Sequence, residues 1–183
     1  MSQAERAPEA PTYESFRRVV ETARLAPGAP VTAELEMSEA DRVALADAFG
    51  VPGVAVLSGA ALAARRAGLV EVEGRVRARL IRQCVASLDE MEEEIEEDFL
   101  VTYTEHAPEP AEGEAEADLD APEPVEDGRI DLGAVLIEQL VLAMHPHPRK
   151  PDATVPEDPG AGARIGAFDA LAALVANEDG EAG

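Results

Sequence analysis

The chain has 183 residues, of which 46% are hydrophobic but only 3% aromatic, with no tryptophan, so any core must be built from aliphatic side chains. Its net charge is −23, but residues 89–128 hold eighteen Asp or Glu and no Lys or Arg, and without them the net charge falls to −5. The single cysteine excludes an intrachain disulfide, and the sequence shows neither a signal peptide nor a run of ~18 apolar residues that could span a membrane, so we expect a cytoplasmic protein without a membrane segment.

The first third of the chain is expected to contain mainly strands. Residues 1–12 are rich in Ala, Pro and Glu and are expected to be disordered. A strand is favoured within residues 13–25, and the alternation of Val31, Ala33 and Leu35 predicts another within residues 30–38. Residues 53–68 are compatible by propensity with either a strand or a helix.

One helix is predicted between these strands, from Ser38 to Gly50. Ser38 is a suitable N-cap, and Asp41 three residues later is a weaker form of the capping-box residue. Gly50 follows the last apolar position, where a helix commonly ends in a left-handed glycine. Local sequence therefore predicts both ends of this helix.

Residues 70–84 show the period-two pattern of a long strand with one buried face. One parity carries small or apolar residues: Val70, Val72, Gly74, Val76, Ala78, Leu80 and Cys84. The other parity carries Glu71, Glu73, Arg75, Arg77 and Arg79. Gly74 is expected to mark a bulge or bend. A second alternation, with Ile95, Phe99, Val101 and Tyr103 on one side, predicts a return strand and hence an antiparallel hairpin that pairs with the upstream strands.

The rest of the chain is predicted to be an acidic insertion followed by two helices. Residues 107–128 are rich in Pro and Glu and are expected to form a disordered loop. Asp131 can cap a helix that Pro146 and Pro148 end. The core-facing side of this helix is predicted to comprise Leu132, Val135, Leu136, Gln139, Leu140, Ala143 and Met144. A short amphipathic helix is predicted near the C-terminus, with Phe168, Leu171, Leu174 and Val175 on one face.

Candidate catalytic and metal-binding residues are few. His145 and His147 form an H-x-H pair, but the only other histidine is His106 and the only cysteine is Cys84, whereas zinc usually takes four ligands. Cys84 is expected to be a buried small hydrophobic residue rather than a nucleophile. The carboxylates of residues 89–98 lack the order of a calcium loop, and no nucleotide-binding or nucleophile-elbow motif is present. We therefore predict no metal, no cofactor, no small-molecule substrate and no enzymatic activity, with a hydrolase as the least favoured alternative.

Six arginines lie in or beside predicted strands: Arg65, Arg66, Arg75, Arg77, Arg79 and Arg82. Arg75, Arg77 and Arg79 share the outward parity, so together they could contact RNA phosphates. Alternatively, they could form ion pairs across the hairpin with the acidic strand 92–98. We favour the second arrangement, because the predicted hairpin places the two rows of opposite charge side by side.

Three stretches carry a resemblance to a known family. They are VEVEGRVRARLIRQCVASLDEMEEEIEEDFLVTY, IDLGAVLIEQLVLAMHPHPRKPDA and AFDALAAL. In this order they resemble the YceD family, the large ribosomal RNA subunit accumulation proteins. The resemblance covers about residues 13–176, which implies a single domain with the acidic insertion 107–128 and a disordered end at 177–183. The matching positions are Gly74, Cys84, Leu88, Asp131, Leu132, Glu138, Leu142, Pro146 and Pro148.

The resemblance implies a bacterial, cytoplasmic, non-enzymatic factor that supports accumulation of large-subunit (23S) rRNA. Many members have a second cysteine where this chain has Ser87, and further cysteines after the P-x-P, where this chain has RKPDATVPEDPG. Any metal role of those cysteines therefore does not carry over to this chain.

Together these observations predict an α+β fold: an antiparallel sheet or small partly closed β-barrel with packed helices and a disordered acidic loop. The predicted function is ribosome biogenesis through binding of 23S rRNA or a large-subunit ribosomal protein. The alternative is an acidic chaperone-like module that binds a basic large-subunit ribosomal protein without touching RNA, which the acidic loop favours because it would repel phosphate. Candidate interaction residues are Arg75, Arg77, Arg79, Asp131, Glu138, Pro146, Pro148, Arg149 and Lys150.

Overall fold

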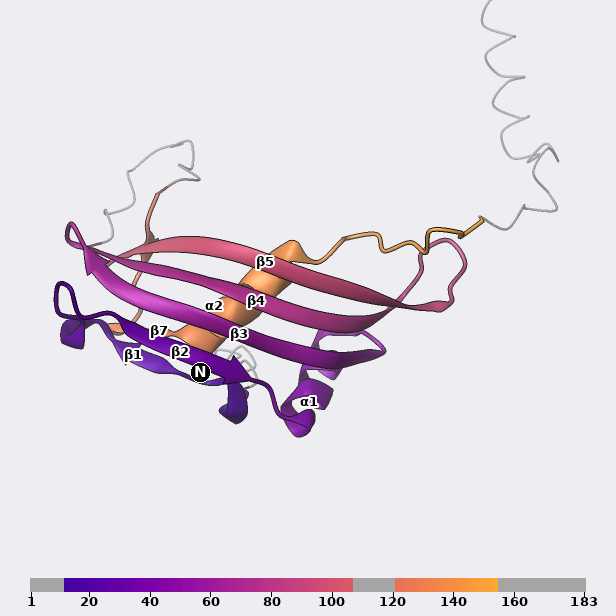
Figure 1. The fold of residues 1–183 in the computed structure, drawn as a ribbon, viewed down its shortest axis with the longest axis horizontal. Coiled ribbons are helices and arrows are strands. Elements are labelled where there is room, and N and C mark those ends of the chain that lie inside the picture. Colours follow the sequence, from indigo (N-terminus) through magenta and orange to yellow (C-terminus); the bar gives the residue numbers. More distant parts are fainter. Residues whose placement is uncertain (1–11, 107–120, 155–183) are drawn as a thin grey trace, which may run out of the picture.

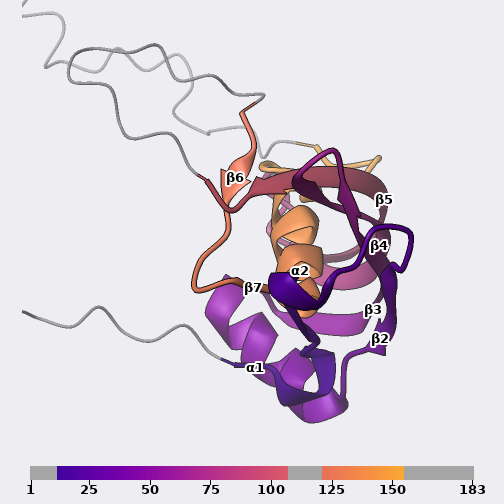
Figure 2. The same cartoon turned by 90° about the vertical axis from the view of Figure 1, so that its left-hand side faces the viewer.

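The computed structural model describes residues 12–106 and 121–154. Its centre is a twisted five-stranded sheet, in the order β2-β3-β4-β5-β6, with one long helix, α2, against its inner face (Figure 1). The strands curve around one side of α2, and the second helix, α1, lies beside them (Figure 2). The α+β class is confirmed. Of the two predicted architectures the open sheet is found, because in the described residues β2 and β6 do not pair and so no barrel closes.

The elements follow the chain in a simple order. They are η1 Glu14–Phe16, β1 Val19–Glu21, η2 Thr22–Arg24, β2 Val31–Glu36, α1 Glu39–Phe49, β3 Gly53–Arg66, β4 Leu69–Gln83, β5 Glu90–Thr104, β6 Glu123–Pro124, β7 Arg129–Asp131 and α2 Leu132–Ala143. Strands β2 to β5 pair antiparallel with their chain neighbours, whereas β6 pairs parallel with β5. No helix among these elements is long and apolar enough to cross a membrane.

Pairing with distant strands determines the structure of the segments for which no clear prediction could be made from the sequence. Residues 53–66 form the strand β3, which pairs with β4 along its length and with β2 over residues 58–63. Residues 13–25 contain only a three-residue strand, β1, between two 3-10 turns. β1 pairs with β7, from Val19 opposite Asp131 to Glu21 opposite Arg129. The predicted strand is thus present but short, and it forms a separate two-stranded ribbon.

The predicted hairpin is formed by β4 and β5, whose register runs without interruption from Val70 opposite Tyr103 to Gln83 opposite Glu90. Val72, Val76 and Leu80 are fully buried on the inner parity, as the period-two pattern predicts. Of the predicted bulge or bend at Gly74, the bulge is absent, because the register on both sides of this residue is continuous. A Cβ on Gly74 would come within 2.7 Å of the Phe99 ring, so the glycine makes room for the aromatic side chain opposite it.

The two predicted helices that lie in the described residues start at their expected caps, and α1 also ends at its predicted glycine. Ser38 Oγ accepts a hydrogen bond from Asp41 N at 3.3 Å, and Gly50 has a left-handed φ of 62°. At α2, Asp131 Oδ1 accepts from Gly133 N at 3.0 Å. The buried face of α2 comprises Leu132, Gly133, Val135, Leu136 and Leu140. This face packs closely on β3, since a Cβ on Gly59 would come within 2.6 Å of Leu136.

The end of the predicted acidic insertion has regular structure. Residues 123 and 124 form β6 beside Tyr103 and Thr104, and a tight turn with positive φ at Asp127 and Gly128 leads into β7. The expected disorder of residues 1–11 and 107–120, and the predicted helix near residues 165–177, lie outside the described residues.

Candidate functional site

The arginine row of β4 lies on the outer face of the sheet, on the side away from α2. Arg75 Nη2 lies 2.8 Å from Asp98 Oδ2, and Arg77 Nη2 lies 2.9 Å from Glu96 Oε1. Hydrogen bonds from Arg77 and Arg75 hold the pKa values of Glu96 and Asp98, respectively, below their usual range. Cross-strand pairing, the favoured arrangement, is therefore confirmed, and two of the three outward guanidinium groups already have acidic partners.

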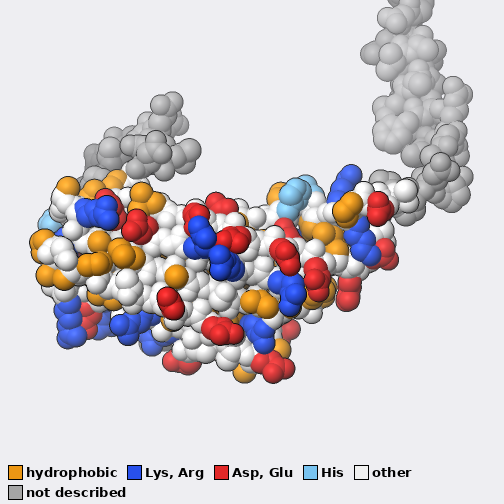
Figure 3. All heavy atoms as spheres, in the orientation of Figure 1, with side chains coloured by type: hydrophobic (Ala, Val, Ile, Leu, Met, Phe, Trp, Pro, Cys, Tyr) orange, Lys and Arg blue, Asp and Glu red, His pale blue; other side chains and the backbone are white. Residues whose placement is uncertain are grey.

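The other arginines do not join this row into one basic surface. Arg65 lies at the far end of β3, where it pairs with Glu105 at 2.9 Å and donates to the Thr22 carbonyl at 2.8 Å. Arg82 points to the inner side of the hairpin and pairs with Glu93. Arg79 is exposed opposite Glu94 without an ion pair to another described residue. Positive and negative side chains are interspersed over the outer face (Figure 3).

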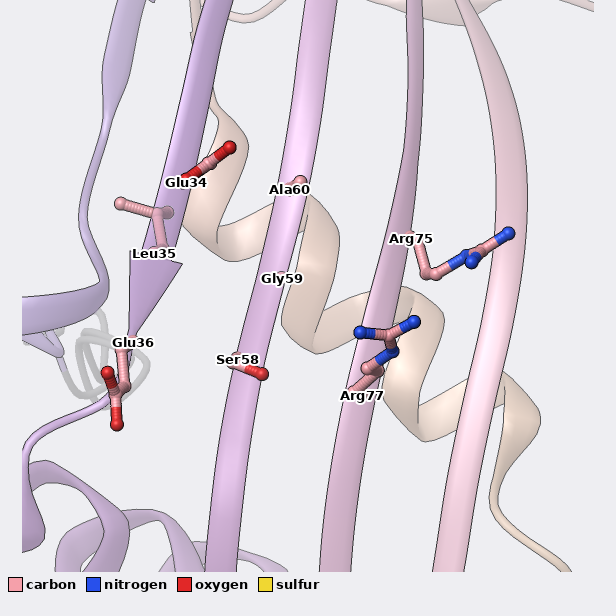
Figure 4. Close-up of a pocket in the computed structure, with 8 residues that line it drawn as sticks. All are labelled: Glu34, Leu35, Glu36, Ser58, Gly59, Ala60, Arg75 and Arg77. Carbon is pink, nitrogen blue, oxygen red and sulfur yellow. The ribbon is translucent and has the colours of Figure 1, made fainter.

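A shallow groove runs along β3 on this outer face. Its floor includes Ser58 and Ala60, and the side chains of Glu34 and Glu36 from β2 and Arg77 from β4 flank it. In Figure 4, Arg75 also lines this region but extends towards β5 and its acidic partner. No histidine or cysteine lines the groove, and its titratable side chains are those of Glu34, Glu36, Arg75 and Arg77.

The segment that follows α2 is bound to the β4–β5 turn. Pro146 and Arg149 are exposed, but Pro148 is buried, and its carbonyl accepts a hydrogen bond from Val85 N at 2.9 Å. Lys150 Nζ lies 3.3 Å from Asp89 Oδ2. These contacts give Pro148 and Lys150 a structural role in fixing the segment, and they leave Pro146 and Arg149 on its outer side.

The two histidines of this segment are exposed. His147 N donates to His145 Nδ1 at 3.1 Å, and His145 N donates to Glu93 Oε1 at 2.9 Å. Across residues 12–106 and 121–154, no three His, Cys, Asp or Glu side chains are grouped closely enough to hold a metal ion. These histidines therefore lie at a helix end without the further ligands that a zinc site needs.

Cys84 is fully buried under the same segment, as predicted from its parity. Its Sγ accepts backbone hydrogen bonds from Lys150 N at 3.4 Å and Ser87 N at 3.5 Å. Hydrogen bonds from Ser87 and from the backbone of Lys150 lower the pKa of the thiol to about 6. Zero exposure keeps this thiol from external reagents, so its role in this fold is to anchor residues 148–150 to the turn.

Asp131 and Glu138 lie at two further places. Asp131, the α2 cap, also accepts from Arg18 N at 2.9 Å and so joins the helix start to the N-terminal segment. Glu138 is exposed on α2 and lies near Glu123, whose pKa is raised first by burial and then by the negative charge of Glu138. The candidate interaction residues thus fall into separate groups, on the outer face, at both ends of α2 and on its exposed side.

One feature that the sequence did not predict is the unpaired acidic row of β5. Glu90, Glu92 and Glu94 are exposed on the outer parity, and none forms an ion pair within the described part of the chain. Glu97 is exposed on the opposite parity. The acidic run at 89–98 was the available signal, but sequence alone did not show that β5 lies at the edge of the sheet along most of its length.

Comparison with known proteins gives one match. The model of the family described as large ribosomal RNA subunit accumulation protein YceD matches residues 72–173, which is more than half of the 183-residue chain. The match begins in β4 and includes β5, α2 and the segment that follows α2. No curated protein and no solved structure matches.

Proposed function

Because the chain belongs to the YceD family of large ribosomal RNA subunit accumulation proteins, we propose that it acts by binding a basic ribosomal protein of the large subunit. In this proposal the chain is a non-enzymatic factor of the bacterial cytoplasm. The chain holds the basic protein until the large subunit is assembled. The rRNA accumulates because this ribosomal protein is delivered to the rRNA.

The observation that carries the proposal is the neutralised arginine row. Binding to nucleic acid gains much of its free energy when Lys and Arg replace the counterions of the phosphates. Arg75 and Arg77 are instead engaged by Asp98 and Glu96, so a phosphate would have to displace a carboxylate that is already in place. The neighbouring carboxylates of Glu90, Glu92 and Glu94 have no such partner among the described residues and favour a basic ligand.

Direct contact with 23S rRNA is the second candidate, and one observation favours it. Four arginines are exposed and have no ion pair to another described residue: Arg18, Arg79, Arg129 and Arg149. Four dispersed cations provide fewer phosphate contacts than a continuous basic groove. The eighteen acidic residues within 89–128 would also repel RNA.

A binding experiment across a salt series separates the two candidates. Purified basic large-subunit ribosomal proteins and 23S rRNA fragments are titrated against the full chain. A length-matched variant, with the acids of residues 107–120 changed to Asn or Gln, tests the insertion while preserving β6, which starts at Glu123. We expect salt-sensitive binding to at least one basic protein, weaker in the variant, and no binding to RNA. Binding to RNA alone, strengthened in the variant, would overturn the proposal.

A further inference from the structure

Strand β5 has a free hydrogen-bonding edge along most of its length. β6 covers only its last two residues, Tyr103 and Thr104. Thr104 O accepts a hydrogen bond from Val125 N on this side. In a strand, the N–H and C=O of one residue point to the same side and alternate between neighbours, and the register of β5 is regular. The groups that face the edge are therefore those of Glu92, Glu94, Glu96, Asp98, Leu100 and Thr102.

Thr102 lies beside β6, but the edge-facing groups of the other five residues have no backbone partner in the described residues. A long unpaired edge is a template for another strand, and proteins commonly protect such an edge with charges. Here the protecting charges all have one sign: Glu92, Glu94, Glu96 and Asp98 are exposed on the outer parity. Within the described part of the chain, only Glu96 and Asp98 of these four are partly neutralised, by Arg77 and Arg75.

The single sign of the charges determines which strand the edge accepts. Two copies of this chain paired through β5 would bring one acidic row against another, which is unfavourable between directly opposed strands. A strand with Lys or Arg on the same face would instead gain cross-strand ion pairs and backbone hydrogen bonds together. We propose that the β5 edge binds an extended basic segment of a protein partner as an added strand. This inference rests on the proposed function and names the surface and the binding mode.

The inner side of the edge adds a second requirement for the partner. Phe99 and Val101 are partly buried there, and α2 packs under β5. In the last turn of α2, which ends beside Glu93, Val141 is 48% exposed and Leu142 is 72% exposed. An added strand would bring its inward side chains to this side, which is apolar apart from the exposed Glu97. The partner segment should therefore alternate basic and apolar residues.

The test uses the full chain and a synthetic peptide of alternating Lys and Val. The control peptide has the same sequence with alternate backbone nitrogens methylated, which preserves charge but prevents strand pairing. In the protein, Leu100→Pro removes an edge-facing N–H without removing a hydrogen bond to β4. Leu100→Ala is its matched control, because it shortens the same exposed side chain and keeps the N–H. Circular dichroism and thermal melts establish that both variants fold, and Glu92→Lys/Glu94→Lys serves as a second variant should Leu100→Pro unfold.

We expect the Lys-Val peptide to bind the wild type and Leu100→Ala with equal affinity. It should bind Leu100→Pro and Glu92→Lys/Glu94→Lys at least tenfold more weakly. Amide hydrogen exchange on adding the peptide should slow at Glu94, Glu96, Asp98 and Leu100, but little at the odd-numbered amides that already pair with β4. Equal binding of the methylated peptide, or edge amides already protected in the free protein, would overturn the inference. A dimer in solution that Leu100→Pro dissociates would also overturn it, in favour of a second copy.

Failure of the inference and failure of the proposed function give different results. If large-subunit basic proteins bind Leu100→Pro and the wild type equally, the edge is not the site, but binding of a basic protein stands. If no basic ribosomal protein binds the wild type while RNA does, the proposed function itself fails.

Discussion

Arg82 of β4 and Glu93 of β5 form an ion pair on the inner side of the hairpin, with 2.6 Å between Arg82 Nη1 and Glu93 Oε2. Both also bind the backbone where α2 ends. Arg82 Nη2 donates to His145 O at 3.2 Å, and Glu93 Oε1 accepts from His145 N at 2.9 Å. The pair therefore fixes the end of the helix to the two longest strands of the sheet.

Removing one member of this pair should destabilise the fold. The two side chains are only 12% and 13% exposed, so Arg82→Met leaves a largely desolvated carboxylate without its cation. We expect the free energy of unfolding to fall by about 3 kcal/mol, measured by urea denaturation. Arg77→Met, which breaks an exposed pair, is the matched control and should cost less than about 1 kcal/mol. If the two variants lost the same free energy of unfolding, the inner ion pair would stabilise the fold no more than an exposed pair does.

Gly133 should be intolerant of any side chain. A Cβ at this position would lie 1.5 Å from the carbonyl oxygen of Phe16, so α2 or the N-terminal segment would have to move. We expect Gly133→Ala to lower the free energy of unfolding by about 2–3 kcal/mol, a typical cost of overpacking. Gly53→Ala is the control, since its Cβ would come no closer than 3.4 Å to Ile81. If both substitutions were neutral, the close contact between α2 and Phe16 would not exist in solution.

Local sequence patterns predicted the hairpin and the two helices of the described residues well. The alternation through Val72, Val76 and Leu80 needs only the two-residue period of a strand, and Ser38 and Asp131 satisfy their caps within a few residues of themselves. The ion pairs of Arg75 and Arg77 were also predicted correctly, because strand parity and the neighbouring acids together determine them, whereas Arg79 forms none with the described part of β5.

Features that depend on distant segments could not be predicted in this way. Residues 53–66 are rich in small side chains without a clear period, and they become a strand because β2 and β4 pair with them on both sides. The burial of Pro148 depends on its segment folding back onto Val85. The free edge of β5 follows from strand order, which no local pattern encodes.

Acid should weaken the contact between Glu105 and Arg65. A hydrogen bond from Arg65 is the main reason that the pKa of Glu105 is lowered from 4.5 to about 2. A carboxyl whose pKa is lower in the folded state stabilises the fold fully above its unfolded pKa and loses this contribution as the pH falls through its folded pKa. We expect Glu105→Gln to be less stable than the wild type at pH 7, with the difference shrinking between pH 5 and pH 2.

The measurement for Glu105 is the midpoint of urea unfolding across that pH range. Glu97→Gln is the control, because Glu97 is exposed and has no ion pair to another described residue. A Glu105→Gln variant that kept a constant stability difference down to pH 2 would contradict the pKa shift and its assignment to Arg65.

Neutralising the arginine row should not impair binding of a basic protein. Arg75→Gln/Arg77→Gln removes two positive charges whose side chains are 47% and 58% exposed. Exposed ion pairs contribute little, so the cost in unfolding free energy should be below about 1 kcal/mol for each substitution. The double variant leaves Glu96 and Asp98 without their cations, so it should bind basic large-subunit proteins as tightly as the wild type or more tightly.

The control for this double variant is Arg79→Gln/Arg149→Gln. It has the same change in net charge without breaking an ion pair between described residues, and it should give a smaller gain in affinity. If the Arg75/Arg77 variant instead lost binding while Arg79→Gln/Arg149→Gln kept it, the row would itself be a contact surface, and its ion pairs with β5 would be a resting state that the ligand displaces.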